Sequence, residues 1–182
     1  MYEVHVPEME YYDEKNGLFS NIDETHFQIE HSLISLSKWE AKWEKPFYSK
    51  EEKTTEEMLD YIKCMTLTKN ISDIVYLSIP NDVLKEIKEY IEKPMTATWF
   101  SDDKKKGRRA SRDIITSEII YYWMIALNIP FECQKWHLNR LLTLIKVCSI
   151  KNAPPKKMKN KDIMRNNAKI NAARRKALNS NG

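Results

Sequence analysis

Apolar and polar residues alternate in the first 31 positions of the chain. Tyr2, Val4 and Val6 are separated by polar residues, and a second alternation covers residues 26 to 30. Between them stands Lys15-Asn16-Gly17, a typical turn sequence. The pattern predicts a small antiparallel sheet at the N-terminus, because a strand places alternate residues on opposite faces.

Beyond residue 32 the apolar residues recur at helical spacing. Ser32 offers an N-cap oxygen to a helix over about residues 33 to 44. Thr54 and Glu57 can form a capping box at the start of a second helix. Three further helices are expected: one that follows Pro80 and stops before Pro94, one that starts near Thr116 or Ser117, and one over about Glu132 to Ser149.

The last two of these helices are expected to form the heart of the fold. The first is apolar nearly all round, and such helices are usually buried in a core. The other carries leucine and isoleucine at i, i+3, i+4 and i+7 from Leu138. Residues 96 to 100 are β-prone and are expected to pair with the N-terminal strands. The predicted fold class is α+β, mainly α: a helical core with a small N-terminal antiparallel sheet and a basic C-terminal tail.

Charge divides the chain close to the helix-breaking segment Ala153-Pro154-Pro155. Residues 1–152 are predicted to form a globular domain, with strands in 1–31 and helices over about 33–149, and residues 153–182 a flexible or helical tail. Residues 151 to 182 contain ten Lys or Arg and one acid, a net charge of +9, whereas the rest of the chain carries −5. The tail is therefore expected to bind its own domain, a second copy or a polyanion. Its candidate binding residues are Lys156, Lys157, Arg165, Arg174 and Arg175.

The sequence also indicates the cellular location of the protein. No apolar run approaches the roughly 20 residues that cross a bilayer, and the N-terminus has neither the basic start nor the apolar stretch of a secretory signal. A cytoplasmic protein without membrane contact is expected. Cys64, Cys133 and Cys148 are widely spaced among apolar residues, which favours reduced thiols over disulfides.

Cys133, His137 and Cys148 form the most metal-like group in the sequence. Cys133 and His137 are spaced one helical turn apart, and zinc accepts thiolate and imidazole ligands. The spacing matches no closed four-ligand pattern, however, and a fourth ligand is missing. A buried thiol near a hydrogen-bonded histidine is the preferred interpretation, so no tightly bound metal is expected.

Catalytic signatures are absent from the sequence. None of the four histidines, His5, His26, His31 and His137, stands in the sequence context of a nucleophile and its base. The only glycines are Gly17, Gly107 and Gly182, which leaves no glycine-rich loop to cradle phosphate. The sequence predicts a protein that is not an enzyme.

Aromatic and basic residues suggest binding instead. Trp136 and Arg140 stand at i and i+4, where a ring and a guanidinium can stack on one side of a helix. The alternative is a tryptophan at the edge of the core, covered by the arginine stem. Leu33, Leu36 and Trp43 share a broad face of the helix that starts after Ser32. The segment from Lys104 to Arg109 is expected to be an exposed basic loop.

Three stretches together resemble the tail assembly chaperones of long-tailed bacteriophages, or closely associated small tail-morphogenesis proteins. They are residues 31 to 40 (HSLISLSKWE), residues 115 to 124 (ITSEIIYYWM) and residues 136 to 145 (WHLNRLLTLI). An aromatic-rich helix that ends near a proline, followed by a Trp-His-x-x-x-Leu-Leu helix, recurs in that family. The resemblance covers the layout of residues 25 to 150 and does not extend to the basic tail.

The resemblance implies a protein that binds the helical tape measure protein and keeps it soluble while tail tube subunits polymerise around it. It also implies self-association, and no cofactor. Trp39, Trp43 and Trp136, expected to be partly exposed, are the candidate partner-binding residues together with Arg140. Two alternatives stay open: a nucleic-acid-binding accessory protein that uses the basic tail, and a structural tail or head completion protein of the virion.

Overall fold

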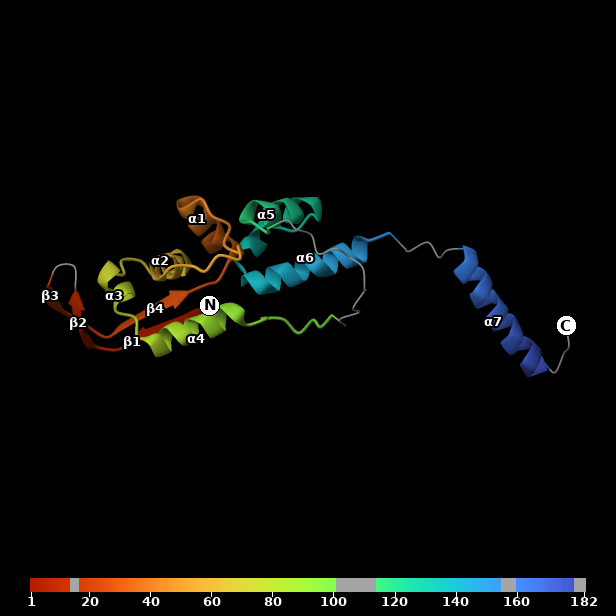
Figure 1. The fold of residues 1–182 in the computed structure, drawn as a ribbon, viewed down its shortest axis with the longest axis horizontal. Helices are drawn as coiled ribbons and strands as arrows, with labels where there is room; N and C mark the ends of the chain where they lie inside the picture. Colours follow the sequence, from red (N-terminus) through yellow and green to blue (C-terminus); the bar gives the residue numbers. More distant parts are fainter. Residues whose placement is uncertain (14–16, 101–113, 155–159, 179–182) are drawn as a thin grey trace. The chain divides into compact units, whose positions relative to one another are not determined.

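The structure, a computed structural model, describes residues 1–13, 17–100, 114–154 and 160–178. The fold is α+β and mainly α, as the sequence predicts, with its strands at the N-terminus (Figure 1). Contacts within the chain separate two units, Met1–Ser149 and Ile150–Gly182.

An interrupted antiparallel hairpin forms the N-terminal part of the first unit, which confirms the predicted sheet. Its four strands make two pairs, β1 with β4 and β2 with β3. Val6 faces Thr25 and Met9 faces Ile22, so both pairs keep one register across the interruption. Pro7, which has no N–H to donate, stands at the interruption. The strands are β1 (Tyr2–Val6), β2 (Met9–Asp13), β3 (Leu18–Ile22) and β4 (Thr25–Ile29).

The β1–β4 pair has one buried and one exposed face. Val4 and Val6 on β1 and Phe27 and Ile29 on β4 are buried. The residues between them point the other way and are exposed, because side chains alternate along a strand. Beyond β4, the Leu67 backbone N–H donates to the Gln28 carbonyl at 2.8 Å, so the chain leaving the next helix pair joins this sheet edge.

Helices α1 (Leu33–Trp43) and α2 (Thr55–Met65) begin at the predicted caps. The Ser32 hydroxyl accepts a hydrogen bond from a first-turn N–H at 3.2 Å. The Thr54 hydroxyl accepts from the Glu57 N–H at 3.2 Å, while the Glu57 carboxylate accepts from the Thr54 N–H at 2.8 Å. Both ends of this capping box are therefore satisfied, and α1 packs along α2.

Helix α4 (Asn81–Glu92) follows the short helix α3 (Asp73–Leu77) and packs along β1. The Tyr90 ring stacks on Tyr2 with centroids 5.1 Å apart, and the Tyr2 hydroxyl donates to Glu86 at 2.8 Å. The helix ends two residues before the next proline, as predicted. These contacts fix one side of α4 to the hairpin and leave its opposite side for other contacts.

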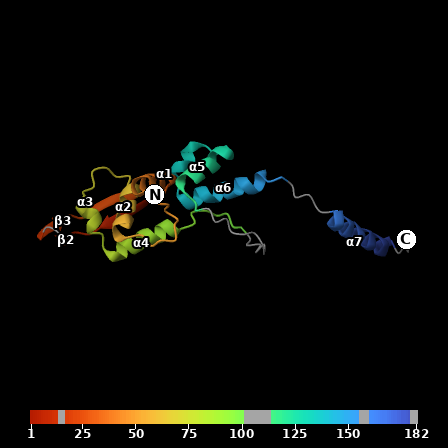
Figure 2. The same ribbon diagram turned by 45° about the horizontal axis from the view of Figure 1, so that its top comes forward.

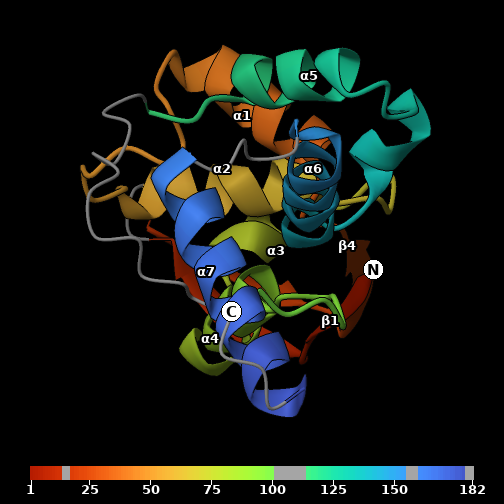
Figure 3. The same cartoon turned by 90° about the vertical axis from the view of Figure 1, so that its right-hand side faces the viewer.

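Helix α5 (Ser117–Ala126) lies beside α1 at the outer edge of the first unit (Figure 3). Ile120 and Met124 are buried, but Tyr122 is 66% and Ile125 is 61% exposed. The expectation that this helix is buried all round is wrong. An apolar composition permits burial on every side, but neighbouring elements cover only one side of α5.

The helix expected over Glu132 to Ser149 is divided into a 3₁₀ helix, η1 (Phe131–Lys135), and α6 (Leu138–Asn152). The backbone is extended at Trp136, and the Leu138 N–H donates to the His31 carbonyl at 2.7 Å. The Leu138 N–H therefore bonds to the segment that follows β4, and not to a carbonyl of a preceding helical turn. The continuous helix was therefore a wrong prediction, because local periodicity does not report pairing over a long sequence distance.

Residues 96 to 100, expected to form a strand, lie outside both sheets. The Thr98 N–H donates to the Thr96 hydroxyl at 3.1 Å, and Trp99 is 90% exposed. The strand prediction is wrong here because a local side-chain contact satisfies a backbone donor that a sheet would otherwise use.

One hydrophobic core joins the buried face of the β1–β4 pair to the helices of the first unit. Its largest fully buried side chains are Trp39, Tyr61, Phe27, Ile29, Leu33, Leu36, Met65, Ile87, Ile120, Met124, Leu138 and Leu141. Every helix from α1 to α6 except the short α3 contributes at least one of them, so the core is shared and is not confined to the α5–α6 region.

The second unit contains the polar helix α7 (Asn160–Leu178), whose described side chains are exposed. Within the described part of the chain, no helix combines the length and apolar character that crossing a membrane requires. The three cysteines are free thiols, Cys133 buried and Cys64 and Cys148 half-buried.

Candidate functional site

The tryptophans of α1 hold that helix to α2. Trp39 is 1% exposed, and its Nε1 donates to the Glu57 carbonyl oxygen at 2.8 Å. The expectation that Trp39 is partly exposed is therefore wrong: its spacing on the helix is equally typical of a core residue. Trp43 is half-buried, and its Nε1 donates to the Asp60 carboxylate at 2.9 Å, a group that also pairs with Lys42.

Trp136 and Arg140 stack as their spacing indicated, with the guanidinium carbon 4.1 Å from the ring centroid. Trp136 is half-buried and lies before α6, not on a helix shared with Arg140. Together with the positions of Trp39 and Trp43, this means that the predicted tryptophans do not form one binding surface.

The predicted basic residues divide between described and undescribed parts of the chain. Arg165, Arg174 and Arg175 are exposed on α7. Lys156 and Lys157, and the segment from Lys104 to Arg109, lie outside the described residues.

Cys133, His137 and Cys148 do not gather as a ligand set within the described chain. Burial raises the pKa of the Cys133 thiol. His137 is buried, and its Nε2 lies 3.1 Å from the Tyr90 carbonyl oxygen. The arrangement has the features of packing residues.

An apolar groove of about 340 Å³ is lined by residues of α2 and α4. The ribbons of these two helices are labelled in Figure 2. Ile62 and Ile87, each 2% exposed, are its most deeply buried lining residues. Met58, Leu84 and Ile91 are half-buried and also line it. None of these five residues was singled out as a binding residue from the sequence.

Helical spacing explains why both helices turn apolar residues toward the groove. Met58 and Ile62 are one turn apart on α2. Leu84, Ile87 and Ile91 fall at i, i+3 and i+7 on α4, a span of about 10 Å at 1.5 Å per residue. The groove is therefore about two helical turns long.

The charged residues that line the groove are all basic. Lys53, Lys85 and Lys88 line it, and none of the described lining residues is acidic. The Lys53 ammonium lies 4.3 Å from the centroid of the Phe47 ring, and burial lowers its pKa. On α4, by contrast, Glu86 is held at the hairpin side by Tyr2. The groove thus combines an apolar lining with positive edges.

A larger cavity of about 410 Å³ between α1 and the end of α2 has a different character. Its lining mixes charges of both signs, from Glu30, Lys38 and Lys135, with serine hydroxyls and the Cys64 thiol. It lacks the continuous apolar surface of the α2–α4 groove. The groove is accordingly the better candidate for binding an apolar helix.

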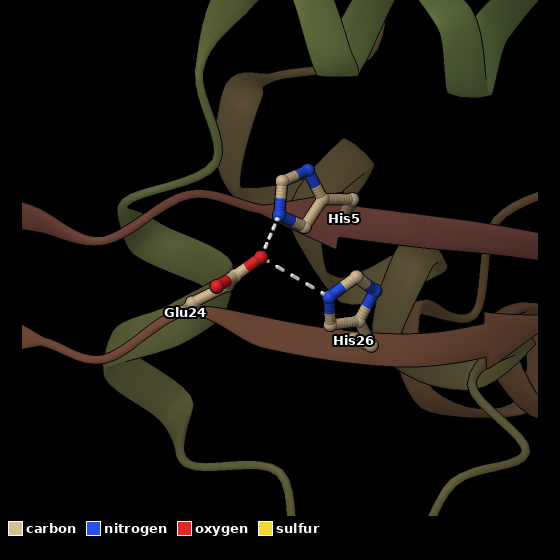
Figure 4. Close-up of side chains that lie close together, drawn as sticks. All are labelled: His5, Glu24 and His26. Carbon is tan, nitrogen blue, oxygen red and sulfur yellow. Dashed lines mark hydrogen bonds and ion pairs between the residues drawn. The ribbon is translucent and has the colours of Figure 1, made fainter.

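The exposed face of the hairpin carries a second feature, a cluster of His5, Glu24 and His26 (Figure 4). His5 and His26 face each other across β1 and β4, and their rings stack with centroids 4.5 Å apart. One Glu24 oxygen lies 2.7 Å from His5 Nε2 and 3.3 Å from His26 Nε2. Hydrogen bonds from His5 and then His26 lower the pKa of Glu24.

The groove and the histidine cluster each have a sequence pattern from which they could have been predicted. The lysines and apolar residues of α4 share one side of a helical wheel. His5 and His26 are equally distant in sequence from the Lys15-Asn16 turn signal, so a symmetrical hairpin brings them face to face.

No protein-family model, curated protein or solved structure matches the chain.

Proposed function

We propose that this protein is a non-enzymatic tail assembly chaperone of a long-tailed bacteriophage, which binds an amphipathic helix of the tape measure protein in the α2–α4 groove. The observation that carries the proposal is the groove itself, because a chaperone for a helical client needs an apolar surface of helical dimensions. The sequence resemblance supplies the class of client. The groove residues, and not the tryptophans expected from the sequence, are the proposed binding site.

A helix lying in a groove inserts side chains at i, i+3 or i+4, and i+7. The separation of Leu84 and Ile91 matches such a set of two or three side chains. Lys85 and Lys88 favour a client helix with acidic residues beside its apolar stripe. Burial of each large apolar side chain contributes about 1.5 to 3 kcal/mol before the cost of ordering the helix is subtracted.

Binding of a helical tape measure segment to the full chain tests the proposal. A fluorescently labelled peptide of about 20 residues, with apolar residues at i, i+4 and i+7 and glutamates beside them, is titrated and followed by anisotropy. Leu84→Asp should weaken binding at least tenfold, because the new carboxylate would be buried against the client. Binding should persist in several hundred millimolar salt, since apolar burial is not screened.

Ile125→Asp on α5 is the matched control. It also replaces an apolar helix residue by aspartate, but at a more exposed position that lies outside the groove. Affinity for the peptide should stay within about twofold of the parent, with both variants checked for unchanged thermal unfolding. If Ile125→Asp abolished binding and Leu84→Asp did not, the client would bind α5 and the groove assignment would be wrong.

The exposed arginines of α7 favour nucleic-acid binding as a second candidate function. Phosphate contacts release counterions, so this binding should weaken steeply with salt and disappear when residues 153–182 are removed. The tail contains no aromatic residue on which a base could stack. If the full chain retained only nucleic acid, and released it as salt rose, the chaperone proposal would fail.

A further inference from the structure

We propose that His5, His26 and Glu24 form a binding site for a divalent transition metal ion of the zinc class on the exposed face of the hairpin. The proposal does not depend on the chaperone function. It departs from the expectation of no tightly bound metal, which rested on Cys133, His137 and Cys148.

The three side chains supply the right donor atoms at nearly the right separations. Two imidazole nitrogens and one carboxylate oxygen are common zinc ligands, bound at about 2.0 to 2.2 Å. A tetrahedral ion with such bonds separates its ligand atoms by roughly 3.3 Å. Here Glu24 Oε1 is 2.7 Å from His5 Nε2 and 3.3 Å from His26 Nε2, and the three donor atoms lie within 4.8 Å of one another. To bind the ion, the two stacked rings must turn so that their Nε2 lone pairs converge on it.

The backbone holds these ligands in place. His5 and His26 are partners in the β1–β4 ladder, so backbone hydrogen bonds fix their separation. Val4, Val6, Phe27 and Ile29 anchor the opposite face of the same strands in the core. Glu24 directly precedes β4, which lets its carboxylate reach the Nε2 atoms of both rings, as Figure 4 shows.

A second carboxylate approaches the outer nitrogen of one ring. Glu3 Oε1 lies 3.9 Å from His26 Nδ1, on the side away from Glu24. Zinc-bound histidines usually direct their second N–H toward a carboxylate or carbonyl. When metal binds, a neutral His26 would keep its proton on Nδ1, toward Glu3, and offer the Nε2 lone pair to the ion. All three ligands are exposed, so water can occupy the remaining coordination position.

Zinc binding to the untagged full chain at pH 7.5, measured by isothermal titration calorimetry, tests the site. We expect one zinc ion per chain, and at least a tenfold loss of affinity in His26→Ala or His5→Ala. Gln28→Ala is the matched control, because Gln28 is exposed on β4 two residues from His26 and is not a ligand. It should leave the affinity unchanged. Glu3→Gln should weaken binding less than loss of a ligand does.

NMR signals of the histidine rings in the unmodified chain test the site without any variant. Zinc should shift the His5 and His26 signals at one equivalent and leave those of the buried His31 and His137 in place. Zinc should also raise the melting temperature of the parent chain and not that of His26→Ala, because the ion joins β1 to β4. Absence of binding at 100 μM zinc would overturn the proposal, as would unchanged binding in the His5 and His26 variants, which would show that the ion binds outside this cluster.

Discussion

The four histidines of the first unit form two pairs that differ in their access to water. His5 and His26 stack on the surface of the hairpin and share Glu24. His31 and His137 meet edge to face in the interior, with centroids 5.1 Å apart. The inner pair has neutral partners: His31 Nδ1 is 2.6 Å from the Tyr61 hydroxyl, and His137 Nε2 contacts the Tyr90 carbonyl.

Burial gives the inner pair a different chemistry. Burial lowers the pKa of His31 to about 3, and repulsion from His137 would add to this only if that ring were protonated. Burial also lowers the pKa of His137, whose Nδ1 has no hydrogen-bond partner within the described chain. A proton on that nitrogen would be a buried, unpaired donor. The inner rings therefore stay neutral and act in packing, whereas the outer rings are exposed and offer their nitrogens to an ion.

The largest expected difference between the pairs is in folding stability. His137→Ala removes a ring that is 4% exposed and packs against both Tyr90 and His31. It should lower the free energy of unfolding by about 2 to 4 kcal/mol, through the cavity and the lost hydrogen bond. Urea unfolding of the full chain measures the change. A loss below about 1 kcal/mol would mean that the ring is not packed in the core.

The second prediction concerns acid sensitivity of the inner pair. In the unfolded chain His31 takes up a proton near its ordinary pKa of 6.5, but in the folded chain it stays neutral down to about pH 3. The unfolded state binds more protons in this window, so stability falls as the pH drops from 6.5 toward 3. Between pH 7 and pH 5 the loss attributable to His31 should be about 2 kcal/mol.

Comparison with His31→Gln isolates this contribution. The variant should show a shallower decrease of unfolding free energy between pH 7 and pH 5, and His137, whose pKa is also lowered, should supply part of the remaining slope. The hydroxyls of Tyr61 and Tyr90 and the carboxylate of Glu30 lie around the pair. The two tyrosines do not titrate between pH 5 and pH 7. An unchanged slope in His31→Gln would contradict the assignment.

Local sequence signals predict where the helices and strands begin better than they predict which other elements pack against them. The Ser32 cap and the Thr54–Glu57 capping box are set by residues three apart, so the sequence predicts both helix starts correctly. The alternation that predicts the N-terminal strands also places His5 and His26 on their exposed face. These features depend on neighbours within one turn or one strand.

Features that depend on distant segments were missed. The break before α6 arises because Leu138 pairs with His31, over a hundred residues earlier. Trp39 is buried because α2 covers it, and Tyr122 on α5 is exposed because no element of the described chain covers it, although both belong to apolar helices. The groove likewise requires α2 and α4 to lie side by side, which neither helix reveals alone.

Removal of one hydroxyl provides a finer test of the inner pair. Tyr61→Phe keeps a fully buried ring but deprives His31 Nδ1 of its partner at 2.6 Å. The unfolding free energy should fall by about 1 to 2 kcal/mol, because a buried nitrogen is left unsatisfied. Tyr122→Phe, which removes an exposed hydroxyl on α5, should change stability by less than about 0.5 kcal/mol. Equal effects would show that the His31–Tyr61 contact adds nothing to stability.

The smallest effect is expected for the outer pair without metal. His5→Ala, measured by urea unfolding in EDTA, should change the unfolding free energy by less than about 0.5 kcal/mol, because solvent screens the exposed interactions with Glu24. His5 is half exposed, so its removal leaves no cavity in the core. A loss above about 1.5 kcal/mol in EDTA would show that the His5–Glu24–His26 contact itself holds the hairpin together. The hairpin would then need no ion to keep β1 and β4 paired.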